Sequence, residues 1–143
     1  MKIIFGSDEK TPLTDAIGKW LVEAGHTVEK VGHLVSEKSK WRWVDIGKTV
    51  GKKISSGEAD FGIVCCWSGT GVCMAANRFP KARAALCWDA ETAKLARKWN
   101  DANILAFSLR FTSETMAKEI LAHWFYTKFD EEGLDEVHKL GEI

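Results

Sequence analysis

Apolar positions along the chain fall into short runs that alternate with helical stripes. The predicted strands, which are continuous apolar runs or alternate between apolar and polar residues, lie at 2–5, 26–31, 61–65, 82–87 and 103–107. The predicted helices, whose apolar residues recur three or four positions apart, lie at 11–24, 43–56, 71–78, 89–99 and from 112 or 113 onward. Five repeats of a strand followed by a helix predict an α/β fold: a five-stranded, mostly parallel sheet with helices on both faces, in three α/β/α layers.

Capping residues support two of these helix starts. Thr11 stands before Pro12, the arrangement of an N-cap and a proline at the first helical position. Asp89 is placed to cap the fourth helix. No internal repeat or low-complexity linker interrupts the pattern, so residues 1–143 are expected to form one domain. The charged tail at 128–143 is expected either to pack on a partner subunit or to stay mobile.

Composition narrows the class of protein. The 143 residues are 45 % hydrophobic, so intrinsic disorder is not expected. Twenty basic residues balance twenty acidic ones, which gives no long-range attraction to nucleic acid or to an anionic membrane. No apolar run approaches the roughly 18 residues of a membrane span, and the apolar start at 1–5 is too short for a signal peptide. We therefore expect a cytoplasmic protein with a small-molecule partner.

Four cysteines, at 65, 66, 73 and 87, are expected to be thiols, because disulfides are rare in the cytoplasm. Their spacing contains no C-x-x-C pair, so no metal site is expected. Seven tryptophans are a high share for this length, and most are expected in the core or at an interface.

Three predicted loops follow strands at the edge where parallel sheets bind ligands, at 6–10, 66–71 and 107–111. The middle loop carries Ser68-Gly69-Thr70-Gly71 between a buried strand and a helix. Its glycines allow close approach of a ligand, and the helix start offers unpaired amides to a phosphate or a developing oxyanion. A plain tight turn would have the same sequence, so both interpretations stay open.

Cys66 ends the strand before this loop and could act as a base or a nucleophile. The alternative is an inert buried thiol, which is what we expect of the other three cysteines. No histidine is placed as an obvious partner for Cys66, which makes a cysteine hydrolase or a redox protein the weaker interpretation.

Charged residues follow two other strands. Asp8 and Glu9 could divide into an orienting group and an acid/base, or could be a solvated loop with a helix-capping acid. Arg110 could bind a phosphate, or could be an ordinary surface arginine.

Taken together, these features resemble the ribose-5-phosphate isomerase B family, which also contains the galactose-6-phosphate isomerase subunits. The resemblance runs from residue 2 to about 125. It is carried by the order and spacing of five segments: FGSD at 5–8, SGEADFGI at 56–63, AANRFP at 75–80, RAALC at 83–87 and NDANILA at 100–106. The resemblance implies a Rossmann-like fold, a homodimer or homotetramer with its active site at the subunit interface, and aldose–ketose isomerisation through an enediolate without a metal or cofactor.

The resemblance also implies residue roles. Cys66 aligns with the family's base, and residues 67–71 align with its C-G-T-G-x-G loop, whose amides stabilise the enediolate oxygen. Asp8 matches the acid of a D-H pair, Arg110 an arginine near the substrate phosphate, and Asn100 the asparagine after a catalytic histidine. The predicted catalytic residues are Cys66, Ser68, Asp8 and Glu9. The predicted substrate-binding residues are Trp67, Gly69, Thr70, Gly71, Trp99, Asn100 and Arg110.

Departures from the family pattern bear on the substrate. Glu9 replaces the histidine of the D-H pair, and Trp99 replaces the histidine that assists ring opening. Indole only donates a hydrogen bond, so Trp99 cannot shuttle a proton. The tail at 131–139 lacks the family's phosphate-binding arginines. We therefore predict an aldose–ketose isomerase of a small pentose, tetrose or hexose phosphate, with an open-chain substrate such as a tetrose phosphate as one hypothesis. The alternative is a non-catalytic sugar-phosphate-binding or regulatory homologue.

Overall fold

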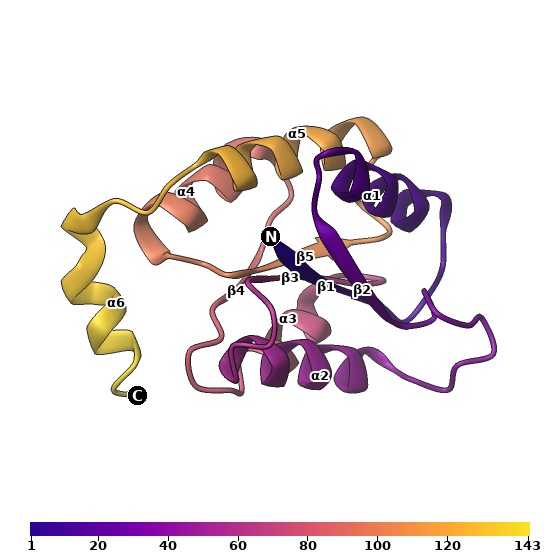
Figure 1. Ribbon diagram of the computed structural model, residues 1–143, viewed down its shortest axis with the longest axis horizontal. Helices are drawn as coiled ribbons and strands as arrows, with labels where there is room; N and C mark the ends of the chain where they lie inside the picture. Colours follow the sequence, from indigo (N-terminus) through magenta and orange to yellow (C-terminus); the bar gives the residue numbers. More distant parts are fainter.

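Five parallel strands form the middle layer of the protein, seen in the computed structural model, which describes all 143 residues (Figure 1). The strand order is β2-β1-β3-β5-β4. Their bounds are Lys2–Ser7 for β1, Thr27–Gly32 for β2, Phe61–Cys66 for β3, Ala84–Leu86 for β4 and Ile104–Ser108 for β5. The predicted α/β fold with a three-layer arrangement is confirmed, and the sheet is parallel throughout.

Helices cover both faces of the sheet: α1, α4 and α5 lie on one side, and α2 and α3 on the other (Figure 1). Their bounds are Pro12–Glu23 for α1, Trp43–Ser55 for α2, Thr70–Ala76 for α3, Ala90–Asn100 for α4 and Glu114–Tyr126 for α5. A 3-10 turn at Glu131–Gly133 and a short α6 at Leu134–Leu140 complete the chain. None of the helices is both long and apolar enough to cross a membrane.

Alternation along the strands divides the core in two. Ile3 and Phe5 belong to the cluster under α1, α4 and α5, whereas Ile4 belongs to the cluster under α2 and α3. The two adjacent cysteines separate in the same way, with Cys65 in the first cluster and Cys66 in the second. The side chain of Cys66 therefore points toward α2 and α3.

Side chains cap the helices as the sequence predicts. The Thr11 hydroxyl accepts a hydrogen bond from the Thr14 amide at 3.3 Å, and Thr14 returns one to the Thr11 amide at 2.9 Å. Asp89 accepts from the Thr92 amide at 2.7 Å. Of the two residues predicted to start the last long helix, Ser113 is the cap. Each cap satisfies an amide that the helix itself leaves unpaired.

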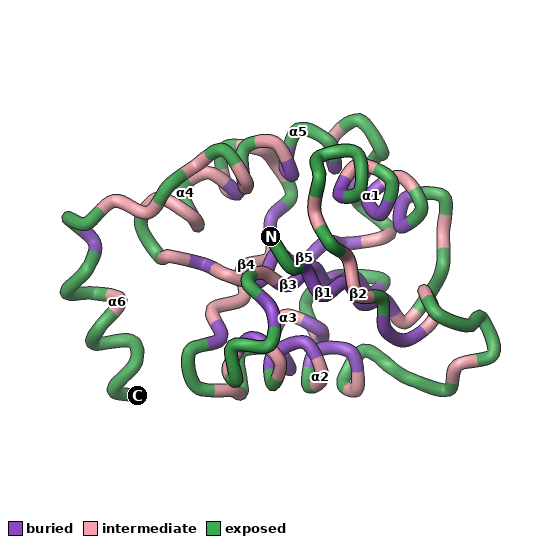
Figure 2. Tube along the Cα trace, in the orientation of Figure 1, coloured by how far each residue is buried: buried purple, intermediate pink, exposed green.

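The fourth strand is shorter than the sequence predicts. β4 has three residues rather than the predicted six, because the chain turns at Ala82, whose amide donates to the Phe79 carbonyl at 3.2 Å. The tail is helical, but α6 buries no residue and stands away from the three layers (Figure 2).

The strand order determines where a ligand can reach the sheet. β1 lies between β2 and β3, and the connections that leave β1 and enter β3 pass over opposite faces, through α1 and α2. Such a reversal opens a crevice at the carboxyl ends of the two central strands. The loops after β1 and β3 therefore border this crevice, and the loop after β5 lies beside them.

Candidate functional site

Cys66 is the last residue of β3 and is only 4 % exposed. Its carbonyl accepts a hydrogen bond from the Leu109 amide at 3.0 Å. The next carbonyl, of Trp67, accepts from the Arg110 amide at 3.0 Å and from the Ser108 hydroxyl at 3.1 Å. These bonds join the loops after β3 and β5, so Cys66 sits on a fixed backbone at the carboxyl edge.

The turn from β3 into α3 requires glycine at position 69. Gly69 has φ +78°, and a Cβ there would lie 2.9 Å from the Phe107 carbonyl carbon and oxygen. The hydroxyls of Ser68 and Thr70 lie 2.7 Å apart and are exposed. Gly69 offers no side chain to cap α3, so the amides of the first turn have no intrahelical partner, and the Thr70 amide donates instead to the Ser68 hydroxyl at 3.4 Å.

The start of α2 covers this turn from one side. An added Cβ at Gly71 would lie 2.9 Å from the Trp43 ring, so the indole packs directly on the glycine backbone. Farther along, Gly47 of α2 faces Ala75 of α3, where an added Cβ would be 2.5 Å away from the alanine Cβ. This close helix contact determines where the first residues of α2 lie relative to the turn.

Asp8 joins the same edge from β1. Ser7 pairs with Cys65 in the sheet, so the residues that follow, Asp8 and Cys66, are neighbours across the β1–β3 crevice. The Ser7 hydroxyl holds the loop by donating to the Glu9 carbonyl at 2.6 Å and accepting from its amide at 3.2 Å. Asp8 is half-buried, whereas Glu9 is exposed.

The charge of Asp8 is influenced by residues from two loops. Burial raises the pKa of its carboxyl above the ordinary value, and the charge of Glu9 works in the same direction. The positive charges of His33 and Arg42 act in the opposite direction. The pKa of Asp8 therefore depends on two side chains that lie outside the three loops predicted to border the site.

The other thiols are suited to packing rather than chemistry. Burial raises the pKa of Cys65 strongly and that of Cys87 to about 12, and it raises the pKa of Cys73 as well. Cys73 also lies against the Ala84 carbonyl at 3.4 Å. No group of three or more His, Cys, Asp or Glu side chains is placed to hold a metal ion.

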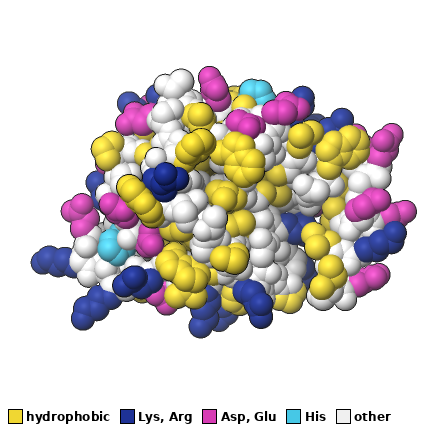
Figure 3. All heavy atoms as spheres, turned by 180° about the vertical axis from the view of Figure 1, so that it is seen from behind, with side chains coloured by type: hydrophobic (Ala, Val, Ile, Leu, Met, Phe, Trp, Pro, Cys, Tyr) yellow, Lys and Arg dark blue, Asp and Glu magenta, His cyan; other side chains and the backbone are white.

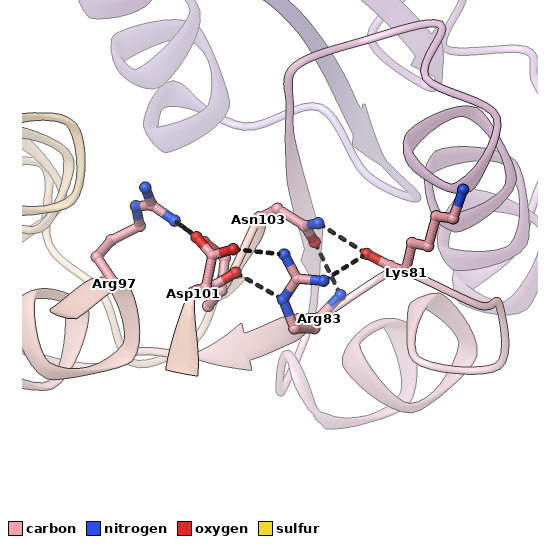
Figure 4. Close-up of polar contacts among 6 residues, drawn as sticks. Lys81, Arg83, Arg97, Asp101 and Asn103 are labelled. Carbon is pink, nitrogen blue, oxygen red and sulfur yellow. Dashed lines mark hydrogen bonds and ion pairs between the residues drawn. The ribbon is translucent and has the colours of Figure 1, made fainter. Parts of the chain in front are cut away.

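Two predicted site residues lie at the opposite edge of the sheet. Trp99 and Asn100 end α4, and Asp101 stops the helix in a left-handed conformation with φ +45°. Its carboxylate binds Arg83 at 2.9 Å and Arg97 at 3.1 Å, in a network at the amino ends of the strands (Figure 4). The five residues of β5, at about 3.3 Å each, separate this edge from Cys66. Within one chain they are not brought to the site.

The surface around the site is open and aromatic. Trp67 is 62 % exposed, and Trp43, Trp88 and Phe111 are exposed as well. Apolar side chains also gather over the face shown in Figure 3. A groove of about 530 Å³ runs along the outer side of α2 and includes no predicted site residue.

Sequence reasoning missed three residues that the structure brings to this edge: His33, Arg42 and Trp43. Each lies in or beside the connection between β2 and α2. His33 directly follows the end of β2, and a polar residue at the end of a strand was the signal that could have placed it at this edge. Its place next to Asp8 depends on the pairing of β2 with β1, and strand order cannot be read from periodicity.

Comparison with known proteins shows a clear family likeness. Residues 3–143 match the family model described as Ribose/Galactose Isomerase. Ribose-5-phosphate isomerase B of Escherichia coli is 35 % identical over 90 % of this chain and 86 % of its own length. D-erythrulose-4-phosphate isomerase of Pectobacterium atrosepticum is 31 % identical over 99 % of this chain and 93 % of its own. The DNA damage-repair/toleration protein DRT102 of Arabidopsis thaliana is 39 % identical over 90 % of this chain, which spans 40 % of that longer protein.

A solved structure gives the same picture. Ribose-5-phosphate isomerase B of Clostridium thermocellum superposes with a TM-score of 0.92 at 36 % identity, over 99 % of this chain and 96 % of that one. The likeness therefore extends over the whole fold, including the carboxyl edge and the tail.

Proposed function

The chain belongs to the ribose/galactose isomerase family, and from this premise we propose that it interconverts the aldose and ketose forms of a small sugar phosphate, with Cys66 as the base. One observation carries the proposal. Cys66 ends a central strand beside a glycine turn that opens α3 without a side-chain cap from Gly69, and the Thr70 amide of that turn makes only a long hydrogen bond, of 3.4 Å, to the Ser68 hydroxyl. A base and a set of oxyanion donors are the two elements that proton transfer next to a carbonyl needs.

The proposed reaction moves one proton between two carbons. The Cys66 thiolate removes the proton from the carbon next to the carbonyl, and the electron pair moves onto the carbonyl oxygen to form an enediolate. The amides at 69–71 stabilise the charge on that oxygen, while Ser68 and Asp8 exchange protons with the sugar hydroxyls. The Cys66 thiol then returns its proton to the neighbouring carbon, and the other carbon becomes the carbonyl.

A four-carbon 4-phosphate is the substrate that the residues favour. Its terminal oxygen is esterified, so it cannot close a five-membered sugar ring and needs no ring-opening group. Trp99 cannot supply a proton shuttle, in keeping with such a substrate. The relative named D-erythrulose-4-phosphate isomerase, which aligns over 99 % of this chain, supports the same choice.

We further propose that the working enzyme is a homodimer or a homotetramer with its active site at the subunit interface. Trp99 and Asn100 lie at the edge away from Cys66, so they could reach a site only in another subunit. The unburied α6 and the exposed aromatic side chains are surfaces that a second copy could cover.

The decisive experiment measures solvent deuterium incorporation next to the carbonyl across a panel of tetrose, pentose and hexose phosphates. Turnover and exchange should both fall by about 10²- to 10⁴-fold in Cys66→Ser, the range expected for loss of a general base. Cys73→Ser is the matched control, since it alters a nearby thiol outside the proposed machinery. Binding of a sugar phosphate without any exchange would instead support the non-catalytic alternative.

A further inference from the structure

His33 and Arg42 delimit the connection between β2 and α2, and both lie at the carboxyl edge. Gly32 pairs with Ser7, and the His33 amide donates to the Ser7 carbonyl at 3.0 Å. Gly32 has φ +70°, and a Cβ there would lie 2.7 Å from the same carbonyl oxygen. The glycine thus lets the chain turn across the end of β1, which leaves His33 next to Asp8.

Arg42 reaches the edge from the other end of the connection. It immediately precedes Trp43, whose ring lies on Gly71 of the proposed enediolate turn. The Arg42 amide donates to the Asp45 carboxylate at 2.9 Å, which fixes the backbone at the start of α2. The guanidinium takes no part in this contact and is exposed.

The side chains of His33 and Arg42 are both free of protein partners. Neither the His33 imidazole nor the Arg42 guanidinium makes a hydrogen bond or an ion pair, whereas Lys10, on the neighbouring loop, pairs with Asp15 at 3.1 Å. Their charges nevertheless reach Asp8 and lower the pKa of its carboxyl against the effect of burial. Two donors without protein partners are thus anchored beside the acidic residues Asp8 and Glu9, His33 by its amide hydrogen bond to Ser7 and Arg42 by its place before Trp43, which packs on Gly71.

An anionic substrate needs such donors. A phosphate near Asp8 and Glu9 would be repelled unless cations offset their charge. A guanidinium offers a fork of N–H groups that suits phosphate geometry, and an imidazole N–H can add another bond. We propose that Arg42 and His33 bind the anionic end of the substrate and so determine the preference for a phosphorylated sugar. This inference rests on the proposed isomerase function of the same site.

The test compares a phosphorylated substrate with its unphosphorylated counterpart in Arg42→Met and His33→Gln. The KM for the sugar phosphate should rise about 10- to 100-fold in each variant, the effect of losing one charge-assisted hydrogen bond. The KM for the unphosphorylated sugar should change less than about twofold. Arg42→Lys should recover part of the loss, because it keeps the charge without the fork. Lys48→Met, which removes an exposed lysine of the outer α2 groove, should have no effect.

Equal effects on both sugars, or an unchanged KM for the phosphorylated one, would overturn the inference. Calorimetric titration of each variant with D-erythrose 4-phosphate and with inorganic phosphate separates it from the proposed function. If the wild type binds D-erythrose 4-phosphate but turns over no sugar, the isomerase proposal fails. Loss of that binding in Arg42→Met and His33→Gln would still support the anion site, and retained binding would exclude it.

Discussion

Among single residues near the site, Gly69 is one that cannot carry a side chain without strain. Its left-handed φ and its contact with the Phe107 backbone both exclude a side chain. A side chain at residue 69 would push the turn away from the β5 backbone, and the first amides of α3 would move with it. The positions of the proposed oxyanion donors thus depend on the absence of a side chain at residue 69.

Replacement of Gly69 by alanine should destabilise the protein by about 3 kcal/mol, from strain in φ and from overlap with the β5 backbone. Gly25→Ala is the matched control. Gly25 also has a positive φ, of +86°, but an added Cβ would meet nothing within 4 Å. Its cost should be limited to about 1 kcal/mol of backbone strain. Urea unfolding of both variants measures the difference, and equal losses would show that the contact with β5 contributes nothing.

The raised pKa of Asp8 predicts a dependence of stability on pH. The folded protein holds the Asp8 proton more tightly than the unfolded chain, so this carboxyl costs stability as the pH rises from its ordinary pKa of 3.8 through the raised value. Asp8→Asn should therefore increase the free energy of unfolding at pH 7 relative to the wild type, with the gain shrinking as the pH falls toward 3.8.

Asp89 provides the control of opposite sign. Hydrogen bonds from Thr92 lower the pKa of its carboxyl, so Asp89→Asn should lose stability at pH 7 and lose progressively less as the pH falls. Urea unfolding curves at about pH 4 and pH 7 would compare the two variants. The same pH trend in both would contradict the assigned environment of Asp8.

At the scale of elements, the contact between α2 and α3 links the core to the site. Gly47 allows the two helices to approach closely, and Trp43, one turn earlier in α2, then lies on the glycine turn. A shift of α2 would move Trp43 and Arg42 together. The arrangement of the crevice therefore depends on helix packing as well as on the loops themselves.

Gly47→Ala should destabilise the protein by about 2 kcal/mol, because the added methyl group would lie 2.5 Å from the Ala75 Cβ and 2.6 Å from the Val72 carbonyl oxygen. Gly18→Ala, also within a helix, should instead stabilise it by about 0.5 to 1 kcal/mol, because its nearest neighbours are 3.8 Å away and alanine favours the helix. Thermal unfolding of the pair distinguishes a packing role for Gly47 from general helix propensity. Stabilisation by both alanines would rule out the tight crossing.

The elements themselves were predictable, because their signals are local. The strand predicted at 61–65 is observed as Phe61–Cys66, and the helix predicted at 43–56 as Trp43–Ser55. The order β2-β1-β3-β5-β4 was not predictable, since it depends on contacts between residues far apart in the sequence. The position of His33 beside Asp8 follows from that order. The sequence alone therefore predicts the three loops that border the crevice, but not that the connection between β2 and α2 lies beside them.

At the scale of the whole molecule, the two edges of the sheet hold different parts of the predicted site. Cys66 and Asp8 lie at the carboxyl edge, and Trp99 and Asn100 at the amino edge. The tail leaves the body from the amino edge, where the Asp130 amide donates to the Lys98 carbonyl at 2.8 Å. A second copy would be needed to bring the two sets of residues together.

Deletion of residues 134–143 tests whether α6 belongs to such an assembly. The helix buries no residue in its own chain, and Leu134, Leu140 and Ile143 are exposed, so its removal should leave the circular dichroism spectrum of the body unchanged apart from the loss of seven helical residues. The cut preserves the contacts of Asp130 and Gly133 with α4. If α6 packs on a partner, sedimentation velocity should show a smaller species than the full chain at the same concentration, and isomerase activity should fall with it.

Leu140→Glu in the full chain should shift the association equilibrium in the same direction, since a charge cannot be buried unpaired at an apolar contact without a large cost. Unchanged sedimentation in both variants would mean that the subunits associate, if they do, through the body alone.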